Sequence, residues 1–205
     1  RLGGEPKTEV WYIADAEEGA ELYVGVKSGV DADAFEEAMD RGTVDQVVHT
    51  LHPGKGDYIF IESGRLHAIG AGLLIYESQQ NSDPTYLVYD WNRKGLDGQP
   101  RRLHLSESMM CIDFDDVEPA LDSSDSEVLC TCDYFRLEKH DVTDAASFGA
   151  ALAGRFGIVT VVGGEVGFPD GGKAGEGDFF MVSHGADCGG LSVSGGSSVL
   201  VTTWP

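Results

Sequence analysis

The stretch that decides the fold runs from Gly56 to Gly72 and reads Gly-Asp-Tyr-Ile-Phe-Ile-Glu-Ser-Gly-Arg-Leu-His-Ala-Ile-Gly-Ala-Gly. Its aromatic and β-branched residues predict a strand over 57–61, and Gly64 predicts a turn after it. His67 then stands at the start of the next strand. Such a turn can aim an imidazole into a barrel interior, where its neutral nitrogen is a good metal ligand. On spacing alone, a histidine that hydrogen-bonds within its own turn is the more common case.

Similar β-rich segments recur along the whole chain and predict a mainly β protein with a few short helices. We expect strands at 9–13, 21–26, 73–79, 85–90, 129–139, 156–162, 165–168, 178–182, 191–193 and 199–203. Helices are expected after the N-cap Asp31, over 43–51, and from Ser106 to Ile112, because apolar residues there follow helical spacing.

The chain divides into two β units with a weak internal repeat. Gly56-Asp-Tyr-Ile-Phe-Ile in the first half is echoed by Gly177-Asp-Phe-Phe-Met-Val in the second, which favours two related barrels. An acidic, turn-prone stretch separates them. We therefore expect a first domain over 1–118 with a short helical insert at about 31–51, a linker over 119–127, and a smaller domain over 128–205.

Composition excludes several classes of partner. The formal net charge of −21 over 205 residues repels nucleic-acid backbones and anionic membrane surfaces, so we expect neither as a partner. No apolar run is long enough to cross a bilayer.

Four scattered cysteines are too few for a disulfide framework and indicate a reduced, cytoplasmic protein. The first residue is Arg1, so we expect a processed or truncated chain.

Four segments carry a resemblance to a known family. They are Lys7-Thr-Glu-Val-Trp-Tyr12, Ser63-Gly-Arg-Leu-His-Ala-Ile-Gly-Ala-Gly72, Glu77-Ser-Gln-Gln-Asn-Ser-Asp-Pro-Thr-Tyr86 and Tyr89-Asp-Trp-Asn-Arg93. In order and spacing they resemble class I mannose-6-phosphate isomerases (phosphomannose isomerases) of the short bacterial form, lacking the amino-terminal part. The resemblance implies a fold of tandem cupin-type jelly-roll barrels (a bicupin) with a few short helices.

The resemblance also implies roles for individual residues. Glu9 and His67 fall on the family's zinc ligands, Lys7 on an active-site lysine, and Glu77 on a glutamate that lines the sugar pocket. The implied reaction is the interconversion of mannose 6-phosphate and fructose 6-phosphate through an enediol, with Zn²⁺ and no organic cofactor. The partner would be a small sugar phosphate, and the protein a monomer or weak homo-oligomer.

Two departures from the family pattern keep other interpretations open. The family's Gln-x-His ligand segment lies upstream of Lys7 and is absent, so this chain alone should bind zinc poorly. Leu87 stands where the family has a catalytic arginine, and Arg93 or Arg65 would have to replace it. The alternative is a non-catalytic bicupin that binds a sugar phosphate or serves a structural role; an iron or manganese cupin oxygenase is a weaker one. The second domain has no histidine corresponding to His67, which predicts a barrel without metal.

Overall fold

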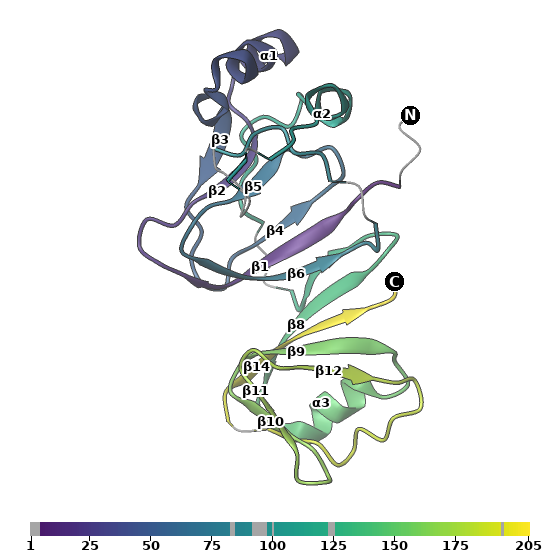
Figure 1. Ribbon diagram of the computed structural model, residues 1–205. Helices are drawn as coiled ribbons and strands as arrows, with labels where there is room; N and C mark the ends of the chain where they lie inside the picture. The colour runs from purple at the N-terminus through teal and green to yellow at the C-terminus, as the bar shows by residue number, and fades with distance from the viewer. Residues whose placement is uncertain (1–4, 83–84, 92–97, 100, 123–125, 194) are drawn as a thin grey trace. The chain divides into compact units, whose positions relative to one another are not determined.

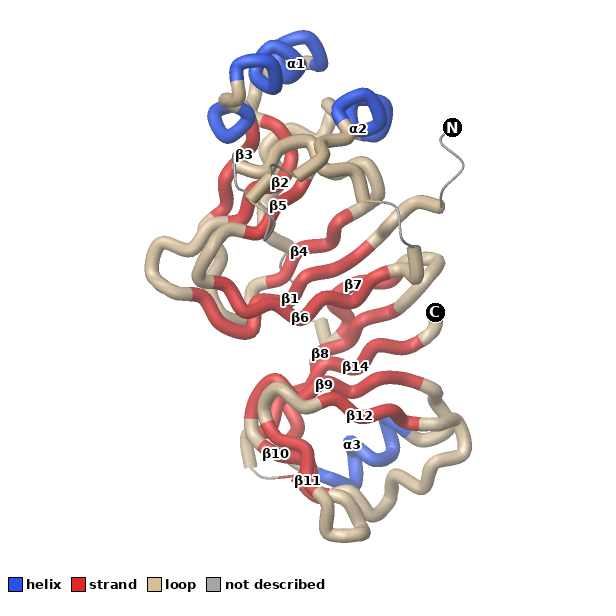
Figure 2. The backbone as a smooth tube through the Cα atoms, in the orientation of Figure 1, coloured by secondary structure: helices blue, strands red, loops and turns tan. Residues whose placement is uncertain are grey.

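The structure of the protein, a computed structural model, describes residues 5–82, 85–91, 98–99, 101–122, 126–193 and 195–205 (Figure 1). The chain separates into two compact units, residues 1–122 and 123–205. The division falls within the stretch 119–127. Both units are built mainly of strands, as the red segments of Figure 2 show.

The first unit is a sandwich of two antiparallel three-stranded sheets. One has the order β4 (Tyr58–Ile61), β1 (Glu9–Ala16), β6 (Leu73–Gln79), and the other β3 (Val48–Leu51), β2 (Leu22–Val26), β5 (His67–Ile69). Alternate residues of both sheets point inward and form the core, because successive side chains of a strand face opposite sides. The buried members are Trp11, Ile13, Leu22, Val24, Ile59 and Ile61.

Two helices of the first unit confirm predictions made from local signals. Helix α1 (Ala32–Arg41) begins at Asp31, whose side chain accepts a hydrogen bond from the Ala34 backbone N–H at 2.9 Å. Its Phe35 is fully buried and meets Phe114 at a ring-centroid distance of 5.6 Å. Helix α2 (Leu105–Cys111) covers most of the expected 106–112.

Two local predictions in this unit are wrong. The expected helix over 43–51 is a 3-10 turn (Val44–Gln46) followed by β3, because strand β2 offers an edge on which Val48 and Leu51 pair. The segment 85–90 forms no strand. Leu87 instead bonds to His104 through both of its backbone groups: its N–H donates to Nδ1 at 3.2 Å, and its carbonyl accepts from the His104 N–H at 2.8 Å.

The second unit packs a five-stranded sheet against a three-stranded one. The larger has the order β12 (Phe179–Val182), β9 (Gly157–Gly163), β14 (Ser197–Thr203), β8 (Arg136–Val142), β7 (Val128–Thr131). The smaller has the order β11 (Lys173–Gly175), β10 (Glu165–Gly167), β13 (Ser192–Val193). Helix α3 (Ala145–Leu152) adds Phe148 and Leu152 to the core. Helix α3 and strand β11 were not expected from the sequence, and the single strand expected over 129–139 is divided between β7 and β8.

The repeat suggested by the sequence is present as a repeated turn. Gly56 and Gly177 have φ angles of +96° and +94°, which glycine adopts without steric cost. The Asp57 carboxylate accepts from the Gly54 N–H at 2.8 Å, and Asp178 accepts from the N–H of residue 175 at 2.8 Å. The two turns therefore share both backbone shape and side-chain bonding.

The strands around these turns repeat as well. Gly56 N–H donates to the Ile13 carbonyl of β1 at 2.8 Å, and Gly177 N–H donates to the Val161 carbonyl of β9 at 2.9 Å. The sheet order β4-β1-β6 thus corresponds to β12-β9-β14. We conclude that each unit carries a copy of one three-stranded arrangement. No helix within the described residues is long and apolar enough to span a membrane.

Candidate active site

Four polar side chains converge at one end of the first unit. Lys7 and Glu9 lie where β1 begins, His67 opens β5, and Glu77 lies on β6. In the β1–β6 ladder Glu9 pairs with Gln79 and Trp11 with Glu77, which brings Glu77 beside the start of β1. Lys7 Nζ lies 2.5 Å from Glu9 Oε2 and 3.3 Å from Glu77 Oε1, and His67 Nε2 lies 3.0 Å from Glu9 Oε1.

Glu9 is the centre of this cluster and is only 1% exposed. Burial by itself raises the pKa of a carboxyl, since it disfavours the charged form. Hydrogen bonding to His67, Glu77 and Lys7 outweighs burial here and lowers the pKa of Glu9 to about 2. Glu9 is therefore a buried carboxylate that stays charged. His67 Nε2 faces its Oε1 at 3.0 Å.

A backbone contact sets the orientation of His67. Its Nδ1 lies 2.8 Å from the carbonyl oxygen of Arg65, so the hydrogen-bond network assigns the ring proton to Nδ1. In neutral imidazole, Nε2 then carries the lone pair and faces Glu9. Trp11 packs against the ring edge-on at 5.2 Å. Metal-binding histidines are commonly held in this way, with the other ring nitrogen bonded to a backbone carbonyl.

Glu77 has the opposite protonation tendency to Glu9. Its pKa is raised, first by burial and then by the hydrogen bond and negative charge of Glu9, while Lys7 acts against the rise. Burial lowers the pKa of Lys7, but Glu9 and Glu77 outweigh it and raise the value overall. One end of the unit thus holds a charged carboxylate, a carboxyl that readily takes a proton, and a lysine ammonium. Such pairs of unlike carboxyl groups suit proton transfer.

The loop that carries His67 is held by a residue whose role the sequence did not reveal. Arg65 forms a double ion pair with Asp116, with Nε and Nη2 each 3.0 Å from a carboxylate oxygen. Its Nη1 donates to the Phe60 carbonyl at 2.6 Å. The guanidinium, one of the two replacements considered for the arginine missing at Leu87, is therefore engaged in holding the loop. Arg93, the other replacement that we considered, lies outside the described residues.

The donor set fits a metal ion in part. Glu9 and His67 present a carboxylate oxygen and a ring nitrogen to each other, the two ligand types that zinc accepts beside thiolate. No group of three or more histidine, cysteine, aspartate or glutamate side chains suited to a metal occurs in the described part of the chain.

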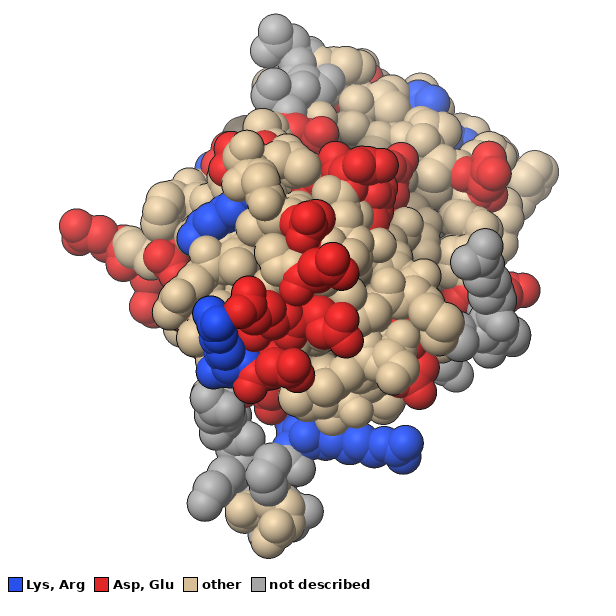
Figure 3. Space-filling model, turned by 90° about the horizontal axis from the view of Figure 1, so that it is seen from above, with Lys and Arg blue, Asp and Glu red and all other residues tan. Residues whose placement is uncertain are grey.

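The face of the protein seen in Figure 3 is acidic. On the face shown in Figure 3, carboxylate side chains gather into broad patches, and lysine and arginine side chains are few. An anionic substrate would therefore depend on local cations such as Lys7, since the wider surface repels it.

Comparison with known proteins identifies the relatives of this chain. Mannose-6-phosphate isomerase ManA of Bacillus subtilis is 32% identical over 166 residues, which cover 78% of this chain and 52% of ManA. The crystal structure of the Bacillus subtilis mannose 6-phosphate isomerase matches with a TM-score of 0.76 and 26% identity, over 98% of this chain and 65% of that one. A mannose 6-phosphate isomerase solved with zinc and yttrium bound has the same fold, with a TM-score of 0.61 and 14% identity over 96% and 66% of the two chains.

These matches bear out the mainly β, cupin-type fold that the sequence predicted. A search of family models gave no match. The chain spans about half the length of the curated relatives that it matches. Over that span, the sequence identity and the shared fold show that the chain belongs to the mannose-6-phosphate isomerase family of class I.

Proposed function

We propose that this chain is part of a zinc-dependent isomerase that interconverts mannose 6-phosphate and fructose 6-phosphate. The observation that carries the proposal is the convergence of Lys7, Glu9, His67 and Glu77 at one end of the first unit. Burying charged groups without a use for them is costly, which favours a functional reason for the cluster. The names of its relatives supply mannose 6-phosphate as the substrate.

The reaction requires a proton to move between C2 and C1 of the sugar. Glu77 is the proposed proton carrier, because burial and the neighbouring Glu9 raise its pKa and so favour uptake of a proton. Lys7 is proposed to stabilise negative charge on a sugar oxygen, since its ammonium remains protonated beside two carboxyl groups.

Glu9 and His67 would hold the metal. Glu9 is already ionised, and the Arg65 carbonyl already directs the His67 lone pair toward Glu9. When bound, zinc would supply Lewis-acid polarisation of the sugar carbonyl. The fold-related isomerase solved with zinc bound supports this choice of ion.

The test is to measure zinc content and isomerase turnover together, on this chain and on the longest protein that its gene encodes. The proposal expects zinc in the longer protein and conversion of mannose 6-phosphate to fructose 6-phosphate. Zinc without turnover would overturn the catalytic assignment and favour the non-catalytic sugar-phosphate-binding protein. Turnover in a metal-free preparation would overturn the zinc assignment.

Two smaller parts of the proposal concern the cellular location and the oligomeric state of the protein. We infer a reducing, cytoplasmic location, because all four cysteines are free thiols. A monomer or weak homo-oligomer is expected, which sedimentation at several protein concentrations would test.

A further inference from the structure

The second unit contains a pocket of about 450 Å³ that the proposed reaction does not use. Small-molecule sites commonly begin at about 300 Å³. Its walls come from β8, from the end of β14 and from the connection between α3 and β9, and they consist of Arg136, Glu138, Arg155, Phe156, Thr203 and Trp204. Phe156 and Trp204 are large apolar side chains that are 45% and 75% exposed.

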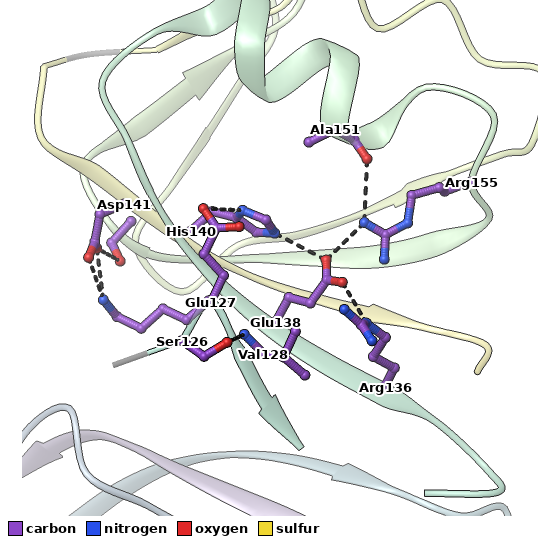
Figure 4. A network of polar contacts seen from close by, with 11 residues as sticks. Ser126, Glu127, Val128, Arg136, Glu138, His140, Asp141, Ala151 and Arg155 are labelled. Atoms are coloured by element: carbon purple, nitrogen blue, oxygen red, sulfur yellow. Dashed lines mark hydrogen bonds and ion pairs between the residues drawn. The ribbon is translucent and has the colours of Figure 1, made fainter. Parts of the chain in front are cut away.

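The polar part of the pocket is an ordered network around one buried carboxylate. Figure 4 shows Arg136, Arg155 and His140 approaching Glu138 from different directions. The distances are 2.7 Å from Arg136 Nε, 2.8 Å from Arg155 Nη1 and 3.1 Å from His140 Nε2. Arg155 Nη2 also donates to the Thr203 hydroxyl at 3.2 Å. The network holds both arginine side chains in place.

This pocket has a local surplus of positive charge. Residues 123–205 contain only four lysine and arginine residues, namely Arg136, Lys139, Arg155 and Lys173. Lys139 pairs with Asp141 at 2.8 Å and Lys173 with Glu165 at 2.7 Å, one carboxylate for each cation. The two arginines share the single carboxylate of Glu138.

One of these arginines retains unused donors. The bond of Arg136 to Glu138 uses only Nε, and its terminal amino groups have no partner within the described parts of the chain. Its side chain is 38% exposed. A guanidinium with free terminal N–H groups can bind phosphate or carboxylate oxygens in pairs.

The repeated strands place this pocket where the other unit has its active-site cluster. Ile61 and Val182 each lie four residues after the aspartate of the repeated turn, and they pair with Glu9 and Gly157 respectively. Gly157 therefore corresponds to Glu9. Two residues earlier, Arg155 corresponds to Lys7.

The correspondence explains why the second pocket keeps a cation but has no counterpart of Glu9. A Cβ at residue 157 would lie 2.9 Å from the Thr202 carbonyl oxygen, so the close approach of β14 excludes a glutamate there. Residue 203 of β14 pairs with Gly157 as Gln79 of β6 pairs with Glu9. The second copy of the site thus has arginine and hydroxyl donors but no carboxylate at the position of Glu9.

We propose that this pocket of the second unit is an anion-binding site for a small organic phosphate or carboxylate. The anionic group lies against Arg136 and Arg155, and the ring or chain of the ligand lies against Trp204 and Phe156. Aromatic side chains beside a guanidinium suit such ligands, because they cover apolar surface while the charged head is bonded.

The experiment is a titration of this protein with phenyl phosphate, inorganic phosphate and benzoate, followed by NMR. The probe is the indole N–H signal of Trp204, assigned by its loss in Trp204→Phe. We expect saturable shifts of this signal with phenyl phosphate, and weaker binding of inorganic phosphate, which lacks the ring. Benzoate shows whether a carboxylate serves as well as a phosphate. Absence of any saturable shift with all three probes would overturn the proposal.

Two variants separate a binding site from a structural ion-pair network. Arg136→Gln should weaken phenyl phosphate binding about tenfold to a hundredfold, the effect of losing a charged hydrogen bond. Glu138 keeps Arg155 and His140 in that variant, and circular dichroism checks that the fold is retained. Lys139→Gln, on the same strand but outside the pocket, should leave binding unchanged. Equal binding by wild type and Arg136→Gln would contradict the assignment.

A third variant tests whether anion binding at this pocket is independent of the proposed isomerase site. Lys7→Gln alters the cluster of the first unit and should leave the Trp204 response unchanged. If Lys7→Gln abolishes that response, binding depends on Lys7 and the assignment to the second pocket fails.

Discussion

His67 and Glu9 face each other through a ring nitrogen and a carboxylate oxygen. Nε2 of the histidine lies 3.0 Å from Oε1 of the glutamate, while Nδ1 is occupied by the Arg65 carbonyl at 2.8 Å. A lone pair and a carboxylate oxygen at this distance repel unless a proton or a metal cation lies between them. The fold therefore prepares a place for positive charge before any ligand binds.

The first prediction concerns metal affinity. In the longest protein that the gene encodes, Glu9→Gln should lower zinc affinity by at least about tenfold, since an amide is a neutral and weaker ligand than a carboxylate. Competition with a zinc-binding dye measures the change. Glu36→Gln, which alters a carboxylate on the exposed face of α1, is the matched control. An unchanged zinc affinity in Glu9→Gln would remove Glu9 from the ligand set.

The second prediction separates proton transfer from substrate binding. Glu77→Gln should reduce kcat by about a hundredfold to ten-thousandfold, the usual effect of removing a general acid or base, with a smaller change in KM. Coupled assays in both directions provide the two constants. If kcat is unaltered, Glu77 is not the proton carrier and serves at most to position Lys7.

The third prediction tests the support of the His67 loop. Asp116→Asn should destabilise the fold by about 1.5–3 kcal/mol, because it leaves the partly buried Arg65 guanidinium without its charged partner. Urea unfolding followed by circular dichroism measures the loss. Zinc affinity should fall as well, since the Arg65 carbonyl orients the histidine. Stability loss without any change in zinc affinity would show that the ion pair does not orient His67.

The fourth prediction concerns acid stability. Burial raises the pKa of Glu138, but Arg155, Arg136 and His140 outweigh it and lower the pKa to about 2, from an ordinary value of 4.5. A carboxyl with a depressed folded-state pKa stabilises fully above its unfolded value and loses that contribution as the pH falls toward the folded value. We therefore expect up to about 3 kcal/mol of stability to disappear between about pH 4.5 and pH 2.

The control for acid stability is Glu138→Gln. This variant should already lack that contribution at pH 7 and should show a shallower loss of stability on acidification, measured by urea unfolding at several pH values. If the variant and the wild type lose stability in parallel below pH 4.5, Glu138 is not the group responsible.

Local signals predicted the parts of the fold that are decided locally. The cap of Asp31 and the spacing that follows it predicted α1, and the aromatic and β-branched residues after Asp57 predicted β4. The prediction of a helix over 43–51 failed because residues 48–51 pair with the edge of β2, which lies distant in the sequence. The start of α3 could have been predicted from Asp144, a residue type that favours helix N-caps. In the structure Asp144 caps α3 by accepting from the Ser147 N–H at 2.8 Å.

The candidate site likewise has residues that the sequence predicted and contacts that it did not. Lys7, Glu9, His67 and Glu77 followed from family motifs, and the structure brings all four together. The Arg65–Asp116 ion pair joins residues 51 apart in the sequence. No short motif reveals such a contact, because only the folded chain brings the two side chains within bonding distance.

The repeated turn shows which residues preserve the sequence signature of the internal repeat. Gly54-Lys-Gly-Asp57 and Gly175-Glu-Gly-Asp178 keep the glycine and aspartate positions that their hydrogen bonds require, whereas the strands after them, Tyr-Ile-Phe-Ile and Phe-Phe-Met-Val, have diverged. A duplication in such proteins is therefore best detected by a spaced Gly-x-Gly-Asp signature. Overall similarity between the halves fades first, since many apolar side chains can fill a strand and few residues can make the turn.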